Sequence, residues 1–185
     1  MKDKLLILIA FLCVFVSAPG MASEYKSNFT RIPAIEGYPV QAGVWARTPT
    51  VIICMYAPVE RQQADKAVNF WTNLGHPFFN TQYKYDPLNK CLAKEPVGYI
   101  TIHLVHQELH LDPASLAETH FFVSDATGEI EWATIYMRSE IKETVLEHEI
   151  GHALGYLHYN KINHLMNSKW TQGGWDKNGL ENKRQ

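Results

Sequence analysis

The sequence predicts an α+β domain in which a sheet is backed by two helices. Runs of β-branched and apolar residues at 48–57 and 97–105 are typical of buried strands, and two shorter runs around residues 126–128 are typical of a hairpin. Two other segments, near 58–75 and 139–155, repeat their apolar residues at helical spacing. The expected order is strand, helix, strands, helix and coil.

The first half of the chain supplies a strand at 48–57 and then a helix. That helix is expected to begin at Pro58, a residue favoured at helix starts, and to end at Gly75, which suits a helix stop. A short strand is expected at 78–81 and a clear one at 97–105.

The second half of the chain supplies the hairpin and the second helix. Strands are expected at 119–125 and 129–137, because Ala126-Thr127-Gly128 between them is a hairpin signal. The second helix should start near Ser139 and end near Gly155. The stretch 167–185 shows little periodicity and is expected to be irregular.

Length and composition limit the classes of protein to consider. The chain has 185 residues, 46% of them apolar, which suits one globular domain with its own core. Its formal net charge of −2 provides no basic excess to neutralise phosphates, so we expect no nucleic-acid partner.

The N-terminus resembles a secretory signal peptide. Lys2 and Lys4 precede a continuously apolar run at 5–16, and Gly20-Met21-Ala22 offers a cleavage site after Ala22. The apolar run is short for a bilayer span, although an uncleaved anchor is the alternative. We therefore expect a signal peptide at 1–22, a polar N-terminal extension at 23–43 and the functional domain at 44–185, secreted or periplasmic and free of the membrane after cleavage.

The cysteines fit an exported protein. Cys13 would leave with the signal peptide, and Cys54 and Cys91 remain as an even pair. A disulfide between them is the natural expectation in an oxidising compartment. Two buried free thiols are the alternative.

The stretch "HEIGHALGYLH", residues 148–158, carries the chemistry. Residues four apart share one face of a helix, so His148 and His152 can bind one cation. Glu149 lies beside the first ligand and can serve as general base toward water held at the metal. This is the arrangement of two zinc ligands and a catalytic carboxylate.

A third ligand completes a catalytic zinc site and leaves one position open. Gly155 can take a positive φ, which ends the helix in a sharp turn and lets His158 approach from a new direction. The sequence therefore predicts one zinc ion held by His148, His152 and His158. An ordinary helix with solvated histidines and a structural zinc site without turnover are the alternatives.

The spacing H-E-x-x-H-x-x-G-x-x-H, together with "NHLMNS" downstream, resembles the metzincin zinc peptidases and among them the matrixins. The resemblance implies a twisted mixed sheet backed by two helices, with an active-site helix and a methionine turn. It implies that Met166 forms a hydrophobic floor beneath the zinc, without being a ligand. It also implies a zinc metalloendopeptidase that binds a protein or peptide substrate extended along an edge strand, for which 119–125 is the candidate. We expect a monomer.

The chain departs from the matrixin pattern at several points. Tyr159 follows the third histidine where matrixins carry serine, and Ser168 stands where astacins and serralysins carry a tyrosine ligand. Residues between Ala22 and the first strand contain no cysteine, so we expect no cysteine-switch control.

Two alternatives stay open at this point. A zinc-containing binding module or pseudoenzyme would keep the fold and the metal without turnover. A second structural metal is conceivable among four histidines and an aspartate, although we favour solvated loop side chains: His103, His106, His110, Asp112 and His120.

Overall fold

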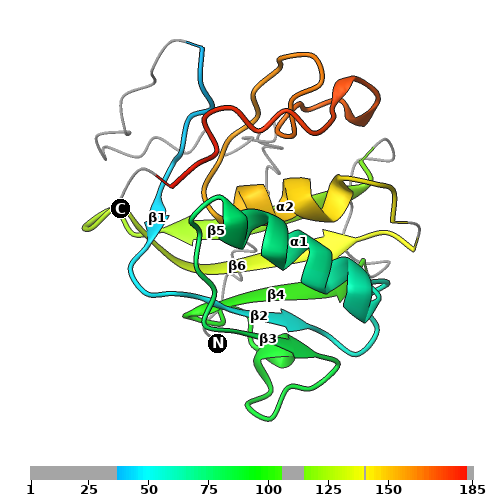
Figure 1. Cartoon of the computed structure of the whole chain (residues 1–185). Helices are drawn as coiled ribbons and strands as arrows, with labels where there is room; N and C mark the ends of the chain where they lie inside the picture. The colour runs from blue at the N-terminus through cyan, green and yellow to red at the C-terminus, as the bar shows by residue number, and fades with distance from the viewer. Residues whose placement is uncertain (1–36, 106–114, 140, 183–185) are drawn as a thin grey trace, which may run out of the picture.

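The computed structural model describes residues 37–105, 115–139 and 141–182. Its elements, in chain order, are β1 (Val44–Trp45), β2 (Thr50–Ile53), α1 (Arg61–Asn73), β3 (Asn80–Tyr83), η1 (Lys90–Leu92), β4 (Tyr99–Leu104), β5 (Ala117–Val123), β6 (Glu129–Met137), α2 (Val145–Ala153) and η2 (Trp170–Gln172). Figure 1 shows α1 and α2 over the same face of the sheet, with the chain after α2 arching above that helix. The predicted α+β architecture of a sheet and two helices is confirmed.

The sheet is mixed, and β5 is its antiparallel strand. The strands follow the order β1-β6-β4-β2-β3, all pairing in parallel, while β5 pairs with β6 in antiparallel. Because β5 runs along nearly the whole of β6, β1 and β4 share the other side of that strand. In the described sheet β5 and β3 are therefore the long edges, and the two-residue β1 ends beside β6.

The core lies between the sheet and the helices. Alternate residues of the central strands face the helices, since side chains in a strand alternate between the two faces. Trp71 on α1 and Ile150 on α2 are fully buried against them. The inward residues of the three central strands are Val51, Ile53, Ile100, Ile102, Ala133 and Ile135.

The hairpin was predicted well, and the first strand was predicted too long. β5 and β6 pair in antiparallel around a turn in which Gly128 N–H donates to Ser124 O at 2.7 Å. β2 ends at Ile53 because Ala57 N–H donates back to Cys54 O and closes a turn at 54–57. The expected strand at 78–81 is displaced to Asn80–Tyr83.

Both helices start later than the sequence suggested. α1 begins at Arg61, since Glu60 and Gln63 form a capping box that fixes the start beyond Pro58. α2 begins at Val145 rather than near Ser139, because Thr144 has a left-handed backbone with φ 68°. The end expected near Gly155 is close to the observed end at Ala153.

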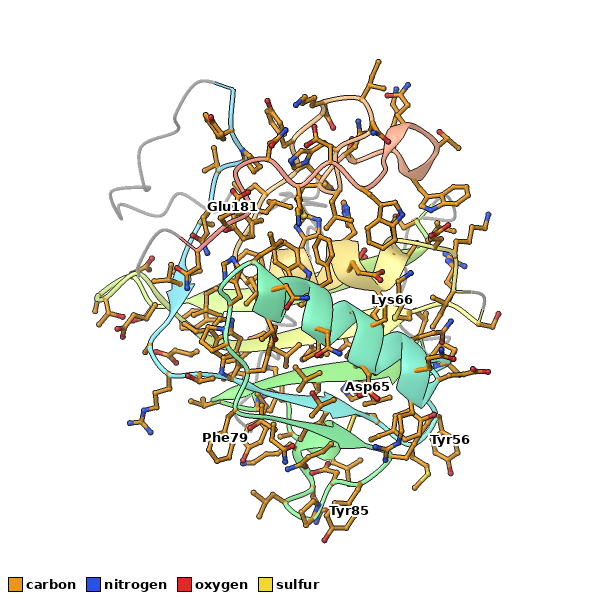
Figure 2. All side chains as sticks on the ribbon, viewed as in Figure 1. Tyr56, Asp65, Lys66, Phe79, Tyr85 and Glu181 are labelled. Carbon is orange, nitrogen blue, oxygen red and sulfur yellow. A yellow bond between two sulfur atoms is a disulfide. The ribbon has the colours of Figure 1, made fainter. Side chains whose placement is uncertain are left out.

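The predicted disulfide is confirmed, and it joins Cys54, after β2, to Cys91 in η1. No helix in the described part of the chain is long and apolar enough to cross a membrane. Figure 2 places the exposed aromatic residues Tyr56, Phe79 and Tyr85 on the β3 side of the molecule, away from α2.

Candidate metal centre

The three predicted histidine ligands come together. His148 and His152 lie one turn apart on α2, and their Nε2 atoms are 3.0 Å apart. His158, from the loop after α2, joins them, and one possible ligand atom from each of the three lies within 4.8 Å of the others. Nitrogen ligands of a tetrahedral zinc stand roughly 3.3 Å apart, so this donor set suits such an ion.

Backbone carbonyls fix the tautomer of the two helical ligands. His148 Nδ1 donates to Leu165 O and His152 Nδ1 donates to Tyr156 O, both at 2.7 Å. With the proton on Nδ1, each Nε2 carries a lone pair directed at its neighbour. Two lone pairs that face each other repel unless a cation lies between them. Histidines that bind a metal usually donate their other ring N–H to a carbonyl or carboxylate, as these two do. The residues present therefore fit a metal ion.

Burial keeps these imidazoles neutral. It lowers the pKa of His148 to about 4 and that of His152 to about 3. It also lowers the pKa of His158. The neutral imidazole is the form that coordinates a metal, so all three rings are ready ligands at neutral pH.

A left-handed glycine turns the chain so that His158 can reach α2. Gly155 has φ 93°, and a Cβ at this position would overlap the carbonyl oxygen of Gly43. The close approach lets Ala42 N–H donate to Gly155 O at 2.7 Å. Only glycine suits this position, because it adopts a positive φ without strain and has no Cβ to overlap Gly43.

The segment 40–45 forms a strap across the end of α2. Gln41 Nε2 donates to Leu154 O at 2.8 Å and Trp45 Nε1 donates to Ala153 O at 2.9 Å. These donors satisfy carbonyls that the end of a helix leaves without partners. Leu157 N–H also donates to Val40 O at 2.8 Å, so the strap fixes the loop that carries the third histidine.

Met166 packs against α2 where the helix has no side chain. It is fully buried, and a Cβ on Gly151 would lie 2.6 Å from Met166 Sδ. Met166 O accepts from Tyr159 N–H at 2.8 Å, next to the third ligand, and its own N–H donates to His164 Nδ1 at 3.1 Å. The turn at 164–166 is thus attached both to α2 and to the loop that holds His158.

Glu149 is buried, with 6% of its surface exposed, and it lines the same cavity as the three histidines. Burial raises the pKa of its carboxyl to about 7, while the hydrogen bond from Thr119 acts in the opposite direction. A cation held by the histidines would lower this raised pKa, because an opposite charge nearby favours the ionised carboxylate. The carboxylate can then act as a base at neutral pH.

The site opens into a cavity of about 500 Å³. One wall is β5, including Thr119 and Phe121, and the other is the segment after Met166, including Ser168 and Trp170. Among the described lining residues, Glu149 is the acidic one whose side chain shares the helix face of the sheet, since the Glu118 side chain bonds His120 on the opposite face. Among the described strands none pairs with the outer edge of β5, so an extended chain segment could lie in this cavity beside that edge.

The described residues of the possible second metal site do not converge. His103 on β4 and His120 on β5 are separated by β6, and the ring of Tyr136 lies between them, 5.6 and 5.5 Å from the two imidazoles. His120 bonds Glu118 at 2.6 Å. His106, His110 and Asp112 lie outside the described residues. Among the described residues, His148, His152 and His158 form the one group that could hold a metal ion.

Sequence reasoning missed the contacts that arrive from distant segments. The sequence predicts Thr119 on the edge strand but not its contact with Glu149. Gln41 falls in the predicted N-terminal extension, and no role was predicted for Trp45. Strand alternation could have put Thr119 on the same sheet face as Phe121. Comparison with known protein families and with curated protein sequences finds no match, so the chemistry of this centre is inferred from its own residues.

Proposed function

We propose that this chain is a zinc-dependent metalloendopeptidase of the metzincin type, closest to the matrixins, which is secreted or periplasmic. The observation that carries the proposal is the convergence of His148, His152 and His158 in a cavity that also holds a buried glutamate, Glu149. A structural zinc site would instead be expected to use a fourth protein ligand. The disulfide supports an oxidising compartment.

The three imidazoles would hold the zinc ion through Nε2 of the two helical ligands and one ring nitrogen of His158. When bound, the ion supplies the positive charge that polarises a peptide carbonyl and acidifies a water molecule. Glu149 would accept a proton from the attacking water at its carboxylate as the water oxygen bonds to the carbonyl carbon, and it would donate that proton to the peptide nitrogen as the C–N bond breaks. The free edge of β5 orients the substrate backbone as an added strand.

The test is cleavage of a mixed peptide library by the zinc-loaded chain and by its Glu149→Gln variant. We expect cleavage by the wild type, its loss on chelation, and recovery with added zinc. Glu149→Gln should keep the zinc and lose about 10²–10⁴-fold in turnover, because it removes the group that moves the proton. Undiminished cleavage by this variant would contradict the mechanism, and retained zinc without cleavage in either protein would indicate a binding module.

A further inference from the structure

Thr119 stands on the edge strand β5 at a position that faces the helices. Its Cα pairs with that of Ile135, a core residue of β6. The two neighbours of Thr119 point to the opposite face of the sheet, where Glu118 and His120 bond each other at 2.6 Å. The alternation of the strand therefore presents an uncharged hydroxyl to α2.

That hydroxyl contacts Glu149 twice. Thr119 Oγ1 donates to Glu149 Oε2 at 2.5 Å, and it lies 3.2 Å from the backbone oxygen of the same residue. A hydroxyl has one proton, so the shorter contact identifies the carboxylate oxygen as its main acceptor. Hydrogen bonds to an ionised acceptor are short and strong, which suits this buried carboxylate.

We propose that Thr119 is a positioning residue for Glu149, holding one carboxylate oxygen so that the other is free to accept a proton from water. This inference rests on the proposed peptidase function. The same hydrogen bond links Glu149 to β5, the edge strand beside which the substrate would lie. One strand would therefore position both the general base and the substrate backbone. Small errors in the placement of reacting groups cost large factors in rate, so the hydroxyl should affect kcat more than substrate binding.

The test compares Thr119→Val, which keeps the shape of the side chain and removes the hydroxyl, with Thr119→Ser, which keeps the hydroxyl. The matched control is Thr134→Val, since Thr134 is a buried threonine on the other face of the sheet, 3.2 Å from Thr101 Oγ1. For each zinc-loaded protein, kcat and KM on a cleaved peptide, zinc content and thermal unfolding are measured. We expect Thr119→Val to lose about 10–100-fold in kcat with KM and zinc content unchanged.

Thr119→Ser should recover kcat to within about threefold of the wild type, and Thr134→Val should leave it unchanged. Wild-type kcat in Thr119→Val, or a Thr119→Ser variant as slow as Thr119→Val, would overturn the role of Thr119 while the proposed function stands. Absence of cleavage by the wild type would overturn the proposed function itself. A crystal structure of the zinc-loaded wild type in which Thr119 no longer contacts Glu149 would overturn this inference independently of turnover.

Discussion

His148 and His152 each place Nδ1 against a backbone carbonyl, and that contact decides which ring nitrogen can bind a metal. The residue spacing in the sequence predicted that the two rings share a helix face, because the helical repeat alone determines this. The carbonyls of Leu165 and Tyr156 could not be predicted, since they belong to a loop whose path depends on the whole fold. The contact of Thr119 with Glu149 was missed because it joins β5 to α2, 30 residues further along the chain.

His76, which is not one of the candidate metal ligands, gives the fold a pH dependence of its own. It is buried after α1, where its Nε2 bonds Leu180 O at 2.8 Å and lies 3.2 Å from Tyr156 Oη. Burial lowers its pKa below the ordinary value of 6.5, so the unfolded chain binds the proton more readily than the folded chain. Its contribution to stability is full above pH 6.5 and is lost as the pH falls toward its folded pKa.

Urea unfolding of the metal-free wild type and of His76→Gln at pH 7.5 and pH 5.5 measures this contribution. The wild type should lose more stability on acidification than the variant does, by at most about 1.4 kcal/mol, because pH 5.5 lies one unit below the unfolded pKa. Leu180 O keeps a donor in the variant, since Tyr156 Oη also donates to it at 3.1 Å. Equal losses in the two proteins would contradict the role assigned to His76.

Contacts with other parts of the fold determine where α2 begins and ends. At its start, Glu143 O accepts a hydrogen bond from Trp170 Nε1 at 2.9 Å, and Trp170 lines the cavity. The residues before Thr144 therefore contact the wall of the cavity and do not extend the helix. At its end, Gly155 turns the chain under the strap at 40–45. Periodicity predicted the apolar face of the helix and its end, but it could not predict a start set by tertiary contacts.

Gly155→Ala should destabilise the protein by at least about 2 kcal/mol, because strain from a left-handed backbone adds to the overlap with Gly43. The matched control is Gly98→Ala, since Gly98 has a similar φ of 85° but nothing within 4 Å of an added Cβ. That control should cost only about 1 kcal/mol, the strain of a left-handed backbone without an overlap. Chemical denaturation measures both, and equal losses would contradict the close approach of the strap.

Across the whole molecule, the disulfide and the metal centre occupy different regions of the fold. The disulfide joins the residue after β2 to η1 and closes a segment that contains α1 and β3, whereas the histidines lie on α2 and the loop after it. An even pair of cysteines, in a chain expected to be exported, was enough to predict the bond. The order of strands was not readable, because β1 and β4 both pair with β6 through contacts distant in sequence.

Replacing both cysteines, Cys54→Ala with Cys91→Ala, should lower the free energy of unfolding by about 3–4 kcal/mol, because the bond closes a loop with a sequence separation of 37 residues. Zinc affinity should stay within about twofold of the wild type, since no ligand or strap residue lies in that loop. Denaturation and zinc titration of the double variant measure the two quantities. A large loss of zinc affinity with the fold intact would show that the two regions are coupled.

The measurement that tests the central claim most directly is zinc binding by the purified chain, by His152→Ala, and by His120→Ala, which alters an exposed histidine outside the group. We predict one zinc ion per wild-type chain, an affinity at least about 100-fold lower in His152→Ala, and no change in His120→Ala. A wild-type chain that binds no zinc, or a His152→Ala chain that binds it equally well, would contradict the assignment of this centre.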